Sequence, residues 1–207
     1  MPAYVALPDD VSAPRPVVVA AHGAGDGPRY QCEFWRELLL ARAFVLCPTG
    51  QPLGKSEEEG HYYKTHHELE REVLAAVEAL RAEYGTHLAP GPFVYVAYSQ
   101  GATMGALMLP AHGNLFSRIV LVEGGFEQWN VSAAKKLRTS GAERVLLVCG
   151  TRSCRRGAER SLEWLKKAGL EARLEMVPGG GHTYGGAVAE RLQQSLAWVF
   201  DGDERFR

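Results

Sequence analysis

Three short segments of the chain carry residues that together suit nucleophilic attack on a carbonyl carbon. In the first, AYSQG, Ser99 directly follows an apolar run and stands between the small residues Ala97 and Gly101. This is close to the G-x-S-x-G pattern, in which a serine on a sharp strand-to-helix turn projects from a sheet. The first glycine is alanine here, and a serine beside a glycine is also typical of an ordinary helix start. Taken alone, the segment leaves both interpretations open.

The second segment is His22-Gly23-Ala24-Gly25, which follows the first clear apolar run. Its glycines let backbone N–H groups turn toward a reaction centre, and the N–H of Gln100 would point into the same space. Two such donors would stabilise the oxyanion of a tetrahedral intermediate by about 3 kcal/mol each. A dinucleotide-binding loop is excluded, because Pro28 replaces its third glycine and no acidic residue follows Cys47-Pro48. Two interpretations of this segment stay open: an oxyanion site and an ordinary glycine-rich turn.

The third segment contains His182, which follows the last apolar run in the glycine-rich loop GGGHTY. A general base must reach the hydroxyl of its nucleophile, and a glycine loop can present an imidazole without steric conflict. An exposed loop histidine is the alternative interpretation. Because His182 follows a predicted strand, as the other two segments do, its position favours a general base over an exposed loop histidine.

The elements that must position these segments follow from the hydrophobic pattern. Continuous apolar runs predict strands that are covered on both faces, as in a parallel sheet; they span residues 16–21, 44–47, 93–97, 119–122, 145–148 and 174–177. Helix-length segments lie between or after them, near residues 30–42, 66–84, 100–111, 156–168 and 185–200. One of these begins with a capping box, Thr65 followed by Glu68. The alternation predicts an α/β fold, a single domain over residues 1–207 with helices on both faces of a mostly parallel sheet.

The candidate residues all follow predicted strands, and sheets of this kind place their chemistry beyond the carboxyl ends of the strands. Together the segments HGAG, AYSQG and GGGHTY resemble the α/β-hydrolase superfamily, from about Pro16 to the final helix. The resemblance implies that Ser99 is the nucleophile and His182 the base. It also implies that the N–H groups of Ala24 and Gln100 form the oxyanion hole. The chain has no room for an inserted cap, so it resembles small carboxylesterases and acyl-protein-thioesterase-like enzymes.

The acid of the expected triad departs from the family pattern. Members of the superfamily usually carry an aspartate after the penultimate strand, where this chain has Ser153, and no aspartate lies between Asp26 and Asp201. Without an acid the imidazole lacks the partner that fixes its tautomer and stabilises its charged form. Glu123 follows the strand after the nucleophile helix, and some superfamily members resemble this arrangement. We therefore predict Glu123 as the acid, with Glu127 as the fallback and a capping or salt-bridging carboxylate as the alternative.

The expected activity is hydrolysis of a small-molecule ester or thioester through an acyl-enzyme, with no cofactor. Tyr62 and Tyr63, in the loop 49–64, and Arg152 are the candidate substrate contacts. Two alternatives stay open: a binding or sensing protein that does not hydrolyse its ligand, and an amidase or peptidase with the same triad. No metal site is predicted, because the histidines and glutamate in the segment 66–70 fall in the first turn of an amphipathic helix.

Composition excludes several other classes of protein. The 207 residues carry a net charge of −1 with both signs mixed along the chain, which argues against nucleic-acid binding and a membrane surface. No apolar stretch approaches the roughly 20 residues of a membrane span, and the N-terminus does not resemble a secretory signal. The four cysteines lack zinc-ligand spacing and are predicted to be free thiols in a cytoplasmic protein.

Overall fold

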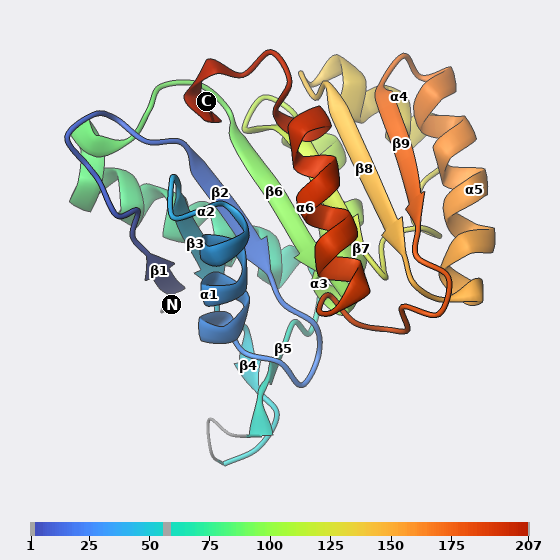
Figure 1. Ribbon diagram of the computed structural model, residues 1–207, viewed down its shortest axis with the longest axis horizontal. Helices are drawn as coiled ribbons and strands as arrows, with labels where there is room; N and C mark the ends of the chain where they lie inside the picture. Colours follow the sequence, from blue (N-terminus) through green and yellow to red (C-terminus); the bar gives the residue numbers. More distant parts are fainter. Residues whose placement is uncertain (1–2, 56–58, 207) are drawn as a thin grey trace.

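A twisted seven-stranded sheet with helices on both faces forms the centre of the molecule (Figure 1). The computed structural model describes residues 3–55 and 59–206. The strands of this sheet are β1 (Ala3–Ala6), β2 (Val17–Ala21), β3 (Phe44–Pro48), β6 (Phe93–Tyr98), β7 (Phe116–Val122), β8 (Arg144–Cys149) and β9 (Glu171–Met176). Their order is β1-β3-β2-β6-β7-β8-β9; β1 is antiparallel to β3 and the other described neighbours are parallel.

Within the described residues, six α-helices connect or follow the strands. They are α1 (Pro28–Leu38), α2 (His66–Tyr84), α3 (Ser99–Met108), α4 (Val131–Thr139), α5 (Arg152–Lys167) and α6 (Ala187–Phe200). Each described connection within the main sheet holds at most one of them. The predicted cap of α2 is confirmed, because the hydroxyl of Thr65 accepts a hydrogen bond from the N–H of Glu68. The six predicted strands and five predicted helices are all present, whereas β1 and α4 were not predicted.

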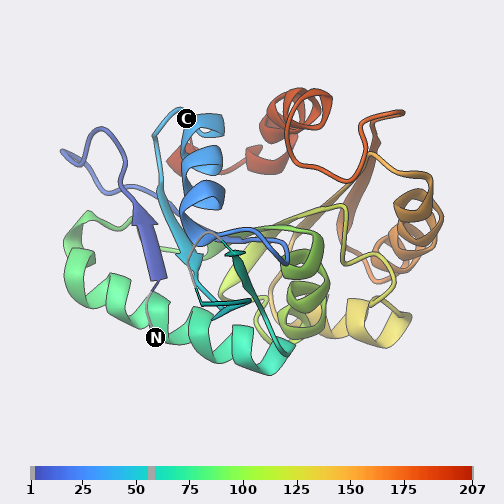
Figure 2. The ribbon, with the colours of Figure 1, turned by 90° about the horizontal axis from the view of Figure 1, so that it is seen from below.

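The continuous apolar character of the strands arises because alternate residues enter two different cores. In β2, Val17, Val19 and Ala21 belong to the core beneath α2, α3, α4 and α5. Val18 and Ala20 belong instead to the core beneath α1 and α6. Figure 2 shows these two helical layers on opposite sides of the sheet. Both faces of the strand are therefore buried, as the pattern predicted.

The carboxyl ends of the parallel strands gather at one edge of the sheet, which is the lower edge in Figure 1. A small antiparallel sheet of β4 (Gln51–Pro52) and β5 (His61–Tyr62) projects from the same edge. It is tied to the HGAG loop, since the N–H of Gly25 donates to the carbonyl of His61 and the N–H of His61 donates to the carbonyl of Asp26. The three segments with candidate catalytic residues, HGAG, AYSQG and GGGHTY, therefore meet at this edge.

The prediction of free thiols is wrong, because the four cysteines form two disulfides. Cys32 of α1 is bonded to Cys47 of β3, and Cys149 of β8 is bonded to Cys154 of α5. Both pairs are brought together by the fold and have no distinctive spacing in the sequence. Disulfides are rare in cytosolic proteins, so these bonds weigh against the predicted cytoplasmic location. None of the described helices is long and apolar enough to cross a membrane.

Candidate active site

Ser99 occupies the sharp turn that the sequence predicted. It is the first residue of α3, directly after β6, and its φ of +49° lies in the left-handed region. A side chain held there costs about 1–3 kcal/mol, which the surrounding structure must offset. Close packing supports the turn, because a Cβ at Gly101 would lie 2.6 Å from the carbonyl oxygens of Ala21 and His22. The second glycine of the G-x-S-x-G pattern is therefore required here, whereas Ala97 fits within β6.

His182 and Glu123 complete a hydrogen-bonded chain that begins at the serine. The Oγ of Ser99 lies 2.8 Å from Nε2 of His182, and Nδ1 of His182 lies 3.0 Å from Oε2 of Glu123. The imidazole side chain is 54% exposed, whereas the Glu123 side chain is 1% exposed. The imidazole is thus open to solvent on one side and held by a buried carboxylate on the other. These distances match the order nucleophile, base and acid.

Glu123 is fixed by the loop where the usual aspartate would stand. Directly after β7 its backbone turns, with a φ of +51°. Its Oε1 accepts hydrogen bonds from the N–H groups of Gly150 and Thr151, and its Oε2 accepts one from the hydroxyl of Thr151. The turn after β8 therefore supplies donors for the carboxylate, and the residue directly after the neighbouring strand β7 supplies the carboxylate itself.

The two other acid positions considered from sequence do not contact His182 among the described contacts. Ser153 is exposed, and its hydroxyl lies 3.1 Å from that of Thr151. Glu127 is also exposed, and its backbone N–H donates to the side chain of Gln128. Of the three, Glu123 is the residue that the fold brings to the imidazole.

The predicted oxyanion donors, the backbone N–H groups of Ala24 and Gln100, have no hydrogen-bond acceptor among the described residues. The glycine loop packs against the serine, since a Cβ at Gly23 would lie 3.2 Å from the Cβ of Ser99. The side chain of Gln100 points elsewhere, and its Oε1 accepts a hydrogen bond from the N–H of Tyr63 at 2.7 Å.

His22, to which the sequence assigned no role, orients the glycine loop. Its ring is fully buried, with Nδ1 2.8 Å from the carbonyl oxygen of Gly23 and Nε2 2.9 Å from that of Thr49. The C=O and N–H of a trans peptide point in opposite directions. Because the carbonyl of Gly23 faces the ring of His22, the N–H of Ala24 points away from that ring.

The predicted substrate contacts take different positions in the fold. Tyr62 is half-buried in β5, and Arg152 is exposed at the start of α5. Tyr63 is only 2% exposed; its hydroxyl donates to the carbonyl of Pro48 and accepts from the N–H of His22. Burial raises the pKa of the Tyr63 phenol well above its usual value, so it remains a donor. Tyr63 thus supports the glycine loop from within. Residues 56–58 of the loop 49–64 lie outside the described part.

Tyr98 and Tyr184 hold the histidine loop, and the sequence pattern indicates neither role. The hydroxyl of Tyr98 donates to the carbonyl of His182 at 2.8 Å, and that of Tyr184 donates to the carboxylate of Asp26 at 3.0 Å. The two rings pack edge to face with their centroids 4.8 Å apart. Burial, followed by the negative charges of Glu123 and Asp26, raises the pKa of Tyr98. The phenol therefore stays protonated and keeps its bond to the loop.

Comparison with known proteins supports the fold at low sequence identity. The esterase PE8 is 24% identical, with 96% of this chain and 97% of that chain covered and a TM-score of 0.63. A thermostable carboxyl esterase from Bacillus coagulans is 12% identical, with 97% and 93% covered and a TM-score of 0.75. Acyl-protein thioesterase 2 from Zea mays is 17% identical, with 96% and 98% covered and a TM-score of 0.65.

The chain has the α/β-hydrolase fold. It spans 62% of the length of an uncharacterized Bacillus cereus protein that also shares the fold, with a TM-score of 0.74 and 14% identity. No family model matches the sequence, and no curated protein matches it. The likeness thus lies in the architecture, so the activity must be argued from the site itself.

Proposed function

We propose that the protein is a serine hydrolase that cleaves a carboxylic ester or thioester through an acyl-enzyme on Ser99. The observation that carries the proposal is the chain of contacts from Ser99 through His182 to Glu123, at 2.8 and 3.0 Å. The similarity of the fold to esterases and a thioesterase supports the same reaction class. An amidase or peptidase with the same triad would use the same chemistry on a substrate whose leaving group is an amine.

The proposed reaction begins with attack of the Ser99 oxygen on the acyl carbon, while Nε2 of His182 takes the hydroxyl proton. Negative charge then develops on the former carbonyl oxygen, where the N–H groups of Ala24 and Gln100 would donate to it. The tetrahedral intermediate collapses, and the leaving alkoxide or thiolate receives the proton from His182. In the second half of the reaction His182 removes a proton from water as the water oxygen attacks the acyl carbon. The bond between that carbon and the oxygen of Ser99 then breaks, His182 returns the proton to the serine oxygen, and the acid is released.

The alternative of a binding protein arose from the missing aspartate. Its motivation is weakened by the contacts of Glu123, whose buried carboxylate accepts hydrogen bonds from two backbone N–H groups, one hydroxyl and the imidazole. A ligand-binding site has no need for a carboxylate aimed at Nδ1 of a histidine that reaches a serine. The hydrolase is therefore the better supported function.

Covalent labelling tests the proposal without knowledge of the natural substrate. A fluorophosphonate probe is expected to add one equivalent to the wild-type protein, and mass spectrometry of peptides is expected to place it on Ser99. The reason is that the probe traps a serine only where a base and an oxyanion site activate it. A folded protein that takes up no probe, or that takes it up on another residue, would contradict the assignment. A panel of p-nitrophenyl esters, thioesters and anilides then separates the three leaving groups.

Tyr98→Phe tests the support of the histidine loop. Removal of the hydroxyl that donates to the carbonyl of His182 is expected to lower kcat about fivefold, which corresponds to the roughly 1 kcal/mol of one hydrogen bond. KM for a p-nitrophenyl ester should stay unchanged, because the phenol hydroxyl already donates to the carbonyl of His182. Tyr4→Phe, on the edge strand β1, is the matched control. Equal kinetics in the two variants would remove Tyr98 from the support of His182.

A further inference from the structure

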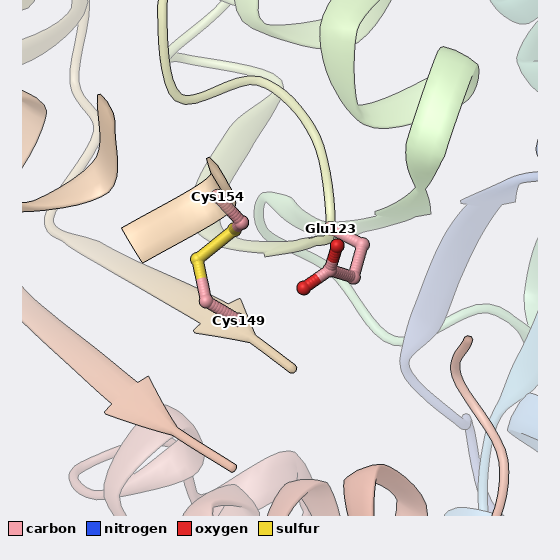
Figure 3. A group of neighbouring side chains, drawn as sticks. All are labelled: Glu123, Cys149 and Cys154. Carbon is pink, nitrogen blue, oxygen red and sulfur yellow. A yellow bond between two sulfur atoms is a disulfide. The ribbon is translucent and has the colours of Figure 1, made fainter. Parts of the chain in front are cut away.

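The disulfide between Cys149 and Cys154 lies directly beside the carboxylate of Glu123 (Figure 3). Both cysteines are buried, at 0% and 1% exposed. One carboxylate oxygen and the two sulfur atoms all lie within 4.8 Å of one another. The proposed triad acid therefore packs against a covalent cross-link that no step of the proposed reaction uses.

The cross-link closes a short ring of backbone that contains the donors to Glu123. Cys149 ends β8, Cys154 lies in the first turn of α5, and Gly150 and Thr151 lie between them. The N–H groups of Gly150 and Thr151 and the hydroxyl of Thr151 are the donors that hold the carboxylate. The position of Glu123 thus depends on the shape of the segment 149–154.

The same ring also contacts the loop that carries the histidine. The N–H of Gly181 donates to the carbonyl of Gly150, and a Cβ at Gly150 would lie 2.3 Å from the carbonyl oxygen of Gly181. A shift of the ring would therefore move the donors to Glu123 and the support of the histidine loop together. Sub-ångström placement of this kind matters, because small errors in catalytic geometry lower rates steeply.

A metal centre is a poorer explanation of this cluster. The sulfur atoms share a bond and are not thiolates, which are the form that binds metal ions. The two oxygens of Glu123 already accept hydrogen bonds from Gly150, Thr151 and His182. These contacts fix the carboxylate in position to accept a hydrogen bond from the imidazole of His182.

We propose that Cys149 and Cys154 are positioning residues for Glu123, and that reduction of their disulfide lowers turnover; this rests on the proposed function. The reductant is a dithiol, which attacks the disulfide and leaves as its own cyclic disulfide. Two electrons and two protons pass to Cys149 and Cys154, which become two thiols. The segment 149–154 then loses its cross-link, and the donors to Glu123 lose their fixed arrangement.

The test uses a pair of double variants that remove one disulfide each. Cys149→Ala/Cys154→Ala is expected to lower kcat for a p-nitrophenyl ester about tenfold with KM within about twofold of wild type. Cys32→Ala/Cys47→Ala is the matched control, because β3 is separated from β8 by β2, β6 and β7 in the sheet. Dithiothreitol added to this control, which retains a single disulfide, is expected to reproduce the tenfold loss. Equal kcat in the two double variants overturns the proposal.

The Glu123→Gln background separates positioning from a general loss of stability. If the disulfide acts through Glu123, removing Cys149 and Cys154 in that background should change kcat by less than about twofold. The same tenfold loss in both backgrounds would show that the disulfide does not act through Glu123 and would overturn the proposal.

A measurement that needs no catalysis keeps the two proposals distinguishable. The amide protons of Gly150 and Thr151 are expected to exchange with solvent about tenfold faster in Cys149→Ala/Cys154→Ala than in wild type, because their hydrogen bonds open more often. If wild type takes no fluorophosphonate but this exchange difference is found, the hydrolase fails and the positioning of Glu123 stands. If wild type is labelled and exchange is unchanged, the positioning role fails and the hydrolase stands.

Discussion

Ser99→Ala is expected to lower kcat for a p-nitrophenyl ester by about 10⁶-fold, the cost of removing the nucleophile from a hydrolase triad. The hydroxyl of Ser99 is the group 2.8 Å from Nε2 of His182, so its loss leaves the base without a nucleophile to activate. Residual activity above the uncatalysed rate is expected from the oxyanion donors alone, at about 10³–10⁴-fold. Steady-state kinetics on purified protein, with the enzyme concentration raised for the variant, measure both values.

Two controls separate this loss from unfolding. Alanine lacks only the hydroxyl of Ser99, whose φ is +49°, so circular dichroism and the melting temperature should be unchanged in Ser99→Ala. Ser153→Ala removes an exposed hydroxyl near the same edge, whose contact is with Thr151, and should retain activity within about twofold. A variant at Ser99 that keeps most of its activity would mean that another group attacks the substrate.

The inner strands of the main sheet could be predicted because nearly every one of their residues is buried and apolar. Each residue of β2, from Val17 to Ala21, is buried on one face or the other, so the run is apolar without interruption. The edge strand β1 was missed because only Ala6 of its four residues is buried. The helix α4 was missed for a similar reason, since its buried residues are Ala134 and Leu137 alone. A stripe this narrow does not stand out from a loop.

The arrangement of the candidate site followed from the order of the strand ends. Ser99, Glu123 and His182 each stand directly beyond, or in the loop after, a strand of the parallel sheet, so the topology brings them to one edge. The register explains how a glutamate directly after β7 reaches the loop after β8, where the superfamily usually carries its aspartate. Val122 pairs with Val148, so Glu123 is level with Cys149 and reaches the N–H groups that follow it.

Contacts made between distant segments could not be predicted. Tyr62 and Tyr63 are adjacent in the sequence and have the same side chain, yet successive residues of an extended chain point to opposite sides. One is half-exposed and the other is buried against His22. The two disulfides raise the same difficulty, because Cys–Cys pairing depends on the separation of the Cα atoms, here 5.9 and 5.5 Å.

Glu123→Gln is expected to lower kcat by about 10⁴-fold while the protein stays folded. The amide oxygen can accept from the N–H groups of Gly150 and Thr151, as Oε1 of the carboxylate does. The NH₂ group then faces Nδ1 of His182, which must accept rather than donate. The proton of the imidazole moves to Nε2, where it blocks removal of the Ser99 proton. The loss should appear in kcat, and fluorophosphonate labelling should slow in parallel.

Glu127→Gln is the matched control for this result, since Glu127 is the other carboxylate that follows β7. It is exposed and makes no described contact with His182, so its variant should keep kcat within about twofold of wild type. The reverse pattern, with Glu127→Gln impaired and Glu123→Gln active, would transfer the acid to Glu127. It would also remove the connection between the Cys149–Cys154 disulfide and turnover, because that connection runs through the donors to Glu123.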